Sequence, residues 1–265
     1  MIKIGFIGAG NMGSALATAT AKAEGTKVYL YDKDEAKAKE VATKCGGEFV
    51  SAQEIAGNCD FIFLAVKPNI IKPAAAEIKE ILKCRSGYTV VSMAAGVSLA
   101  SLRDAFFDGA PIIRIMPNTP ASVGCGMTLY AENEEVSDKA ISDFEFIMEK
   151  SGKLDRIPEK LIDAGSAVSG CGPAFVYMFI EALADGGVAV GLPRDKAITY
   201  AANTLIGAAE TLLQTGEHPE KLKDAVCSPG GSTIEGVRAL EEGAFRAAAS
   251  RAVVKAYEKT LLLGK

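Results

Sequence analysis

The sequence predicts an α/β protein: an N-terminal Rossmann domain, doubly wound around a mostly parallel sheet, and an all-α C-terminal domain. Three observations predict it. A short apolar segment at the start of the chain runs directly into a glycine-rich turn at 8–13. Apolar segments of strand length then alternate with helical periodicity, which is typical of parallel sheets with right-handed crossovers. Beyond Pro158 the apolar spacing is helical throughout, so we place the domain boundary between 1–157 and 158–265.

The glycine-rich turn has the spacing G-x-G-x-x-G at Gly8, Gly10 and Gly13. In that pattern the first glycine permits a tight turn, the second lets backbone approach a pyrophosphate, and the third packs helix against strand. The N–H groups at the helix start then point at the bound phosphates. Glycine-rich turns also close ordinary strand–helix junctions, but the position directly after the first strand favours dinucleotide binding.

An acidic residue, Asp32, ends the second predicted strand at 27–31. It stands about twenty residues beyond Gly13, where a carboxylate can accept a hydrogen bond from a ribose 2′-OH. Asp32 could also cap the helix that begins at Glu35, and the two roles are compatible.

Later apolar segments between residues 60 and 115 are expected to be strands buried on both faces. Ligands of such sheets bind beyond the carboxyl ends of the strands. Small residues and prolines stand at these ends, in 65–69, 93–96 and 116–118, as the close approach of a planar nicotinamide requires. For each segment taken singly, it is equally possible that its glycine and proline residues only terminate the strand.

The composition argues against several classes of protein. The chain has 265 residues, 49% of them apolar, and a net charge of −4, which gives no electrostatic support for nucleic-acid binding. The six cysteines lack metal-type spacing and there is one histidine, so we expect no metal site. We find no signal peptide and no apolar run of membrane-spanning length, and therefore expect a soluble, cytoplasmic protein with reduced thiols and no membrane contact.

The helical half contains a second glycine-rich loop, 228–233, just before a predicted helix. Backbone N–H groups converge at such a position and can bind a small anion such as a carboxylate. An ordinary helix connection capped by Ser232 or Thr233 would also explain the loop. Pro173 is expected to open the first long helix of this half. Wide alanine-rich stripes favour helix faces buried against a second subunit, in an interdigitated, domain-swapped homodimer.

These motifs, taken in order, resemble one family closely. They are Phe6-Ile7-Gly8-Ala9-Gly10-Asn11-Met12-Gly13, Ala65-Val66-Lys67-Pro68, Ala94-Ala95-Gly96-Val97, Met116-Pro117-Asn118-Thr119-Pro120, Gly172-Pro173-Ala174 and 224–234. The chain resembles the pyrroline-5-carboxylate reductases over essentially its whole length, and the Ser-Pro-Gly-Gly segment at 228–231 is the most specific mark.

The resemblance implies a Rossmann domain, a helical dimerisation domain, and dimers that often assemble into larger rings. The implied reaction transfers hydride from NADPH or NADH to the C=N bond of 1-pyrroline-5-carboxylate and gives L-proline, the last step of proline biosynthesis. A protonated imine already carries its proton, so hydride can add without a dedicated strong acid.

The resemblance also assigns roles to residues. Thr233 is the implied catalytic group, with its hydroxyl near the ring nitrogen of the substrate. The implied substrate-binding residues are Glu159, Ser228, Gly230, Gly231, Ser232 and Thr233. The cofactor-binding residues expected from the resemblance and the strand ends are Ile7, Gly8, Ala9, Gly10, Asn11, Met12, Gly13, Asp32, Lys33, Ala65, Val66, Lys67, Pro68, Met93, Ala94, Ala95 and Asn118.

Asp32 departs from many members of that family, which carry a short polar or basic residue at this place. A carboxylate would repel a 2′-phosphate and Lys33 offsets this only in part, so we expect NADH to be well used. One alternative is a β-hydroxyacid dehydrogenase, but the helix expected from Pro173 lacks the lysine that such an enzyme needs. The other is a nicotinamide-sensing regulator, which would have no need of an intact loop at 228–233.

Overall fold

The computed structural model describes residues 1–263, which form two compact units. One unit comprises Met1–Cys171 together with the end of the last helix from Lys255 onwards, and we call it the sheet unit. The other comprises Gly172–Val254, and we call it the helical unit.

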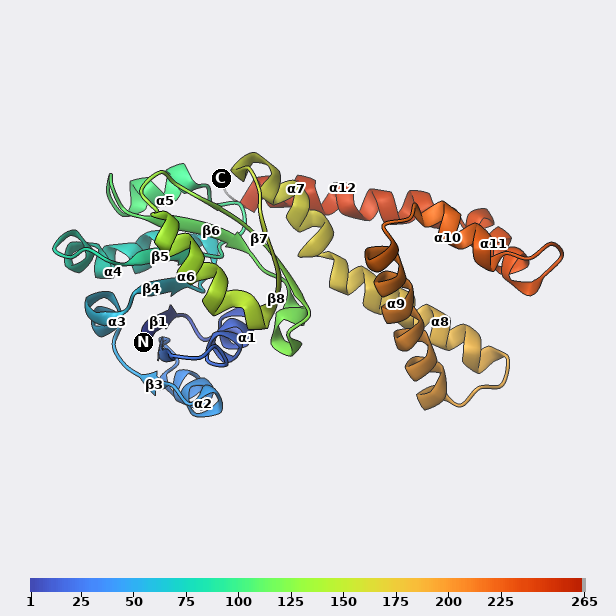
Figure 1. Cartoon of the computed structure of the whole chain (residues 1–265), viewed down its shortest axis with the longest axis horizontal. Coiled ribbons are helices and arrows are strands. Elements are labelled where there is room, and N and C mark those ends of the chain that lie inside the picture. Colours follow the sequence, from blue (N-terminus) through green and yellow to red (C-terminus); the bar gives the residue numbers. More distant parts are fainter. Residues whose placement is uncertain (264–265) are drawn as a thin grey trace. The chain divides into compact units, whose positions relative to one another are not determined.

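The sheet unit is built on one mostly parallel sheet with the strand order β3-β2-β1-β4-β5-β6-β7-β8 (Figure 1). Within residues 1–263, the antiparallel neighbours are β6 and β7, and the other pairs are parallel. This confirms the predicted fold class. The strands are β1 (Ile2–Ile7), β2 (Thr26–Tyr31), β3 (Glu48–Phe49), β4 (Phe61–Leu64), β5 (Thr89–Ser92), β6 (Ile112–Met116), β7 (Gly126–Glu132) and β8 (Gly152–Arg156).

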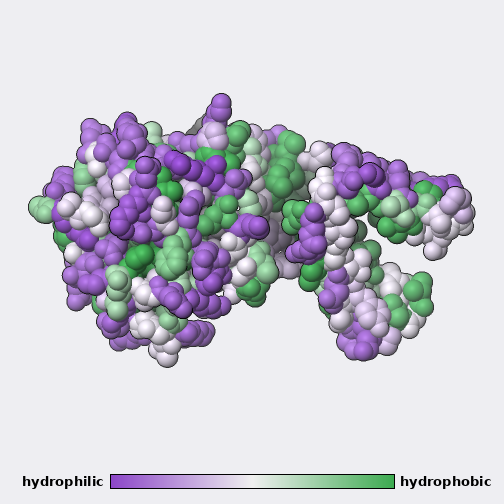
Figure 2. Space-filling view, in the orientation of Figure 1, coloured by the Kyte–Doolittle hydropathy of each residue, from purple (hydrophilic) through white to green (hydrophobic). Residues whose placement is uncertain are grey.

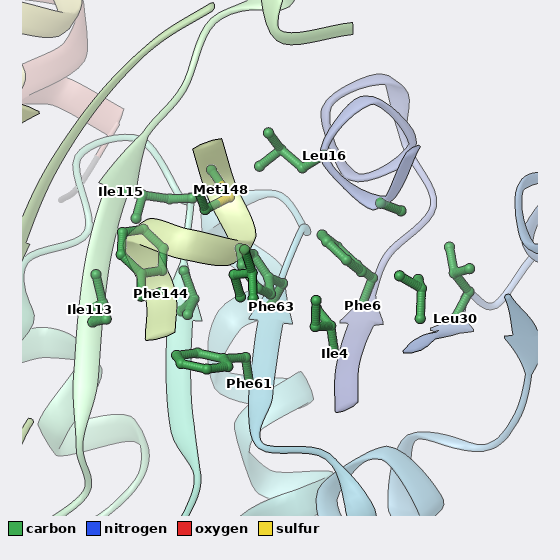
Figure 3. Close-up of a cluster of buried hydrophobic side chains, with 14 of the residues drawn as sticks. Ile4, Phe6, Leu16, Leu30, Phe61, Phe63, Ile113, Ile115, Phe144 and Met148 are labelled. Atoms are coloured by element: carbon green, nitrogen blue, oxygen red, sulfur yellow. The ribbon is translucent and has the colours of Figure 1, made fainter. Parts of the chain in front are cut away.

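Helices cover both faces of this sheet. The helices of the unit are α1 (Asn11–Thr20), α2 (Glu35–Cys45), α3 (Ala52–Asn58), α4 (Ile71–Lys83), α5 (Leu99–Ala105), α6 (Asp138–Met148) and α7 (Glu159–Ser169). On one face, α1, α2 and α6 pack on a core in which the rings of Phe6 and Phe63 stack at 4.6 Å (Figure 3). On the other face, α3, α4 and α5 pack on a second core. Every residue of β4, β5 and β6 is buried, as the apolar segments predict.

Helix α7 packs within the sheet unit. Its Ile162 is fully buried and lies in a small apolar cluster with Met116 and Leu129. The compact units therefore divide after Cys171, whereas the boundary expected from the sequence lies at 157/158, before α7. The domain assignment of 1–157 and 158–265 stays a prediction.

The helical unit consists of α8 (Gly172–Ala189), α9 (Arg194–Thr215), α10 (Pro219–Val226), α11 (Ser232–Glu242) and the first part of α12 (Phe245–Leu263). Its α8 and α9 pack together, and the rings of Phe179 and Phe245 lie 5.4 Å apart. The buried apolar residues of 172–254 are three alanines, while large side chains such as Met178 are 70% exposed. Apolar surface is visible over these helices in Figure 2.

One helical run, Glu159–Ala189, is long and apolar enough to span a membrane, with a mean hydropathy of 1.4. The expectation that the chain has no such run is wrong. Two turn residues, Gly170 and Cys171, divide this run into α7 and α8, and Pro173 is the second residue of α8, where no backbone donor is required. Only 11% of the run's apolar 18-residue stretch is buried, and the exposed apolar side chains of the run include those of α8, such as Met178.

Candidate functional site

The glycine-rich loop joins β1 to α1, and each of its three glycines meets a different steric demand. Gly8 has φ of +109°, and a Cβ there would lie 2.4 Å from the carbonyl oxygen of Ala65. A Cβ on Gly13 would lie 2.4 Å from the carbonyl oxygen of Gly8, so helix and loop touch directly. Around Gly10 there is open space within 4 Å, which leaves room for a ligand against the backbone.

Helix α1 begins without a side-chain cap. Gly10 is its N-cap residue and offers no side-chain acceptor. The first N–H groups of the helix therefore remain for an anion, and the positive end of the helix dipole favours one there. This is the arrangement that the G-x-G-x-x-G spacing predicts.

Asp32 is tied to the same loop. Its Oδ2 accepts from the backbone N–H of Ala9 at 2.6 Å, and its Oδ1 accepts from the N–H of Asp34 at 3.0 Å. Asp34 is the N-cap of α2, and its Oδ1 accepts from the backbone N–H of Lys37. The alternative role of Asp32 as that cap is therefore wrong, because the chain runs two residues further before its first helical turn. Asp32 instead fastens the end of β2 to the glycine-rich loop.

Two cavities flank the loop at the carboxyl ends of the strands. One, of about 290 Å³, has in its lining the predicted residues Ile7, Gly8, Gly10, Asp32, Lys33, Ala65, Val66 and Lys67. The other, of about 400 Å³, has in its lining Ala9, Asn11 and Met12. A larger cavity of about 560 Å³, lined in part by Tyr88 and Pro111, includes none of the predicted site residues. The structure thus brings residues from β1, β2 and β4 to one edge of the sheet, as a dinucleotide site requires.

The ends of β5 and β6 supply the remaining predicted residues. Met93 and Ala95 are half-buried and Ala94 is buried in the turn that precedes α5. Asn118 is buried, and both ends of its amide are used within the protein. Its Nδ2 donates to the carbonyl of Ser169 at 2.9 Å, and its Oδ1 accepts from the N–H of Met127 at 2.9 Å. The side chain of Asn118 therefore holds the sheet unit together, and its contact with a cofactor stays a prediction.

Glu159, the first residue of α7, belongs to a charge cluster around the buried Arg114 that sequence reasoning missed, and its own side chain is half-buried. Arg114 in β6 is 2% exposed and donates from Nη1 to Oε1 of Glu159 at 3.2 Å and from Nη2 to Asp163. The same Oε1 accepts from the backbone N–H of Leu99 at 2.6 Å. The signal was available in the sequence, because a charged residue interrupts an apolar segment that must be buried on both faces.

In the helical unit, the loop 228–233 leads into α11. Gly230 has φ of +69°, and Gly231 is the N-cap of α11 without a side-chain cap. The explanation by a Ser or Thr cap is therefore wrong, because Ser232 is already the first helical residue. A Cβ on Gly231 would lie 2.3 Å from Oγ of Ser228, so a larger residue there would require the Ser228 side chain to move. Ser232 is exposed and Thr233 is half-buried.

Within residues 1–263, no group of three or more His, Cys, Asp or Glu side chains is placed to hold a metal ion. The cysteines of this part of the chain are free. Burial raises the pKa of the Cys59 thiol to about 12, so this thiol is not a nucleophile at neutral pH.

An open helix start behind a glycine-rich loop, an acidic residue after β2, and a cavity at the carboxyl ends of the strands define a dinucleotide-binding Rossmann site, which is the cofactor site of nicotinamide-dependent oxidoreductases. Comparison with protein families agrees with this class. Residues 3–96 match the model "NADP oxidoreductase coenzyme F420-dependent", and residues 159–263 match "Pyrroline-5-carboxylate reductase dimerisation".

Similar proteins cover the whole chain. The pyrroline-5-carboxylate reductase of Escherichia coli is 44% identical over 267 residues, which is 99% of this chain and 98% of that protein. The Arabidopsis thaliana enzyme of the same name is 37% identical and covers 97% of this chain and 94% of its own length. The crystal structure of Plasmodium falciparum pyrroline carboxylate reductase with NADP bound superposes with a TM-score of 0.89 at 34% identity, covering 100% of this chain and 98% of that one. The chain belongs to the pyrroline-5-carboxylate reductase family.

Proposed function

We propose that this protein reduces 1-pyrroline-5-carboxylate to L-proline with NADPH or NADH, the final step of proline biosynthesis. The observation that carries the proposal is the full-length similarity at 44% identity, in a chain that keeps both glycine-rich loops. The residues of the sheet unit fit a nicotinamide dinucleotide, since the backbone at Gly10 is open and α1 has no side-chain cap.

The residues take the following roles. The bound cofactor supplies the hydride. The glycine-rich loop binds the pyrophosphate, and segment 93–95, with the small residues Ala94 and Ala95, admits the nicotinamide end. The backbone N–H groups of 228–233 bind the substrate carboxylate, and the hydroxyl of Thr233 holds the ring nitrogen. Glu159 uses Oε1 for Leu99 and Arg114, which leaves Oε2 for the substrate amine.

We further propose a homodimer assembled through the helical units, and dimers assembled into larger rings. The match of 159–263 to a dimerisation model supports the dimer, as do the exposed apolar side chains of α8 and α9. In this proposal a second chain covers the apolar run Glu159–Ala189, with no lipid contact. A cytoplasmic location and the absence of nucleic-acid partners, consistent with the net charge of −4, belong to the same proposal.

The experiment that tests the function follows the loss of reduced-nicotinamide absorbance when the purified protein meets 1-pyrroline-5-carboxylate. We expect rapid loss, with proline formed in equal amount to the nicotinamide oxidised. Parallel reactions with NADH and NADPH give the cofactor preference. Tight cofactor binding without turnover by either nucleotide would instead favour the sensing regulator.

Asp32 is the reason we expect NADH to be well used. In Asp32→Asn the amide oxygen can still accept from Ala9, while the negative charge and the acceptor for the N–H of Asp34 are lost. We expect kcat/KM with NADPH to rise about tenfold relative to NADH, because repulsion between unit charges near a surface is ~1–4 kcal/mol at contact distance. The matched variant Asp32→Ala also loses the acceptor for Ala9 and should weaken both cofactors. A wild-type enzyme that strongly prefers NADPH would contradict this assignment.

A further inference from the structure

Arg114 is a buried cation in the middle of β6, surrounded in sequence by apolar residues. Its partners Glu159 and Asp163 stand four residues apart on α7 and so lie on one face of that helix. The Nε–H of Arg114 is buried and finds no hydrogen-bond partner among residues 1–263. An apolar residue would fill such a position at lower cost, and a retained buried charge with an unpaired donor calls for an explanation.

The cluster leads to the turn between β5 and α5. Oε1 of Glu159 is shared between Arg114 and the backbone N–H of Leu99, the first residue of α5. Segment 93–99 is thus fastened at its end to the carboxylate that Arg114 orients. Ala95 and Leu99 of this segment also pack against the apolar cluster that contains Ile162 of α7.

We propose that Arg114 is a positioning residue for hydride transfer. Acting through Glu159, it fixes segment 93–99, against which the nicotinamide end of the cofactor lies in the proposed function, on which this inference rests. Hydride transfer is sensitive to such placement, since a displacement of ~1 Å can cost ~100-fold in rate. Asp163 accepts from Nη2 and holds the other end of the guanidinium.

Two sets of measurements on the full-length enzyme test the proposal. Amide hydrogen exchange at 93–99 reports on the segment itself. Steady-state kinetics with a deuterated reduced nicotinamide report on the hydride step, and cofactor titration reports on binding. The variants are Arg114→Met, Arg114→Lys and Glu159→Gln. Arg103→Met is the matched control, because Arg103 is an exposed arginine of α5 with only a surface ion pair.

In Arg114→Met we expect faster exchange at 93–99, a kcat lowered by about tenfold or more, and a larger deuterium isotope effect, because the hydride step becomes limiting. The cofactor Kd should change by less than about twofold, since the glycine-rich loop is untouched. Arg114→Lys, which keeps the charge, should recover part of the loss. The double variant Arg114→Met/Glu159→Gln should be little worse than the worse single variant, because both act through one carboxylate.

Unchanged exchange at 93–99 in folded Arg114→Met would overturn the proposal. So would additive effects in the double variant, or a loss confined to melting temperature with kcat and the isotope effect unchanged. If Arg114→Met does not fold, Arg114→Lys decides by the same readouts, and Glu159→Gln decides by amide exchange at 93–99 alone, because Glu159 is also a proposed substrate contact. A wild-type protein inactive toward 1-pyrroline-5-carboxylate would refute the proposed function, and the exchange measurement would still establish whether Arg114 holds the segment.

Discussion

The sheet unit and the helical unit bury their apolar side chains in opposite ways. In the sheet unit large residues such as Phe63, Tyr130 and Phe144 are fully buried on the two faces of one sheet. In the helical unit the buried apolar residues are alanines, and residues such as Met178 face outward. The sheet unit therefore forms a complete apolar core within one chain. The helical unit needs further apolar surface to cover its exposed side chains, and we propose that a second chain supplies it.

The largest expected effect is on the core of the sheet unit. Phe63→Ala removes a ring stacked on Phe6 and should lower the free energy of unfolding by ~3–5 kcal/mol, because the cavity cannot collapse between two packed faces. Chemical denaturation at several protein concentrations measures it. The control Phe146→Ala, at a residue of α6 that is 42% exposed, should cost much less. If the loss of unfolding free energy in Phe63→Ala varied with protein concentration, the core of the sheet unit would depend on a second chain, which would contradict the comparison.

The next effect concerns the helical unit. Met178, 70% exposed in the single chain, is expected to be buried in the dimer. Met178→Glu should weaken association by ~3 kcal/mol, because it leaves an uncompensated charge in an apolar interface. Sedimentation over a dilution series measures the dimer dissociation constant. Val123→Glu, at a site of the sheet unit that is 74% exposed, is the control, and equal weakening by both variants would remove Met178 from the interface.

A smaller effect is expected from a variant in the helical unit that changes turnover without changing cofactor binding. Thr233→Ala should lower kcat about 10- to 100-fold, ~1.4–2.7 kcal/mol of barrier, because it removes the hydroxyl that we propose lies at the ring nitrogen. The cofactor Kd should stay unchanged, since the proposed dinucleotide-binding residues lie in the sheet unit. Thr233→Ser should restore most of the rate. Unaltered turnover in Thr233→Ala would remove this residue from catalysis.

The smallest effect is electrostatic and lies on the surface of the helical unit. A hydrogen bond from Lys223, the larger cause, and one from Arg246 lower the pKa of Glu220 from 4.5 to about 2. A carboxyl whose pKa is depressed in the folded state stabilises that state above its unfolded pKa, and this stabilisation is lost as the pH falls from 4.5 toward 2. Urea midpoints of wild type and Glu220→Gln should therefore differ slightly at neutral pH and converge in acid. A difference that persists at pH 2 would exclude this ion pair as its source.

The sequence predicted local features well and long-range ones poorly. The strands and the glycine loop follow from short periodicities and from steric demands at Gly8 and Gly13, which act within a few residues. The packing of α7 on the sheet unit could not be predicted, because an amphipathic helix pattern does not indicate which surface the apolar face packs against. The hydrogen bond from Leu99 to Glu159 joins residues 60 positions apart. Helix capping by Asp34 was missed because the sequence offers two aspartates, Asp32 and Asp34, before the same helix.

The strand order has a consequence for how the protein is made. All the strands described lie between Ile2 and Arg156, so the chain of the sheet has been synthesised before the first residue of the helical unit emerges. Domains generally fold as units during synthesis, N-terminal first, so the sheet unit folds at a rate set by one chain alone. If the helical unit is completed by a partner, as we propose, its last step is bimolecular and slows as the concentration of nascent subunits falls. Until it has dimerised, a chain would expose the apolar side chains of α8 and α9 to chaperones and proteases. The yield of enzyme would then depend on the concentration of newly made subunits.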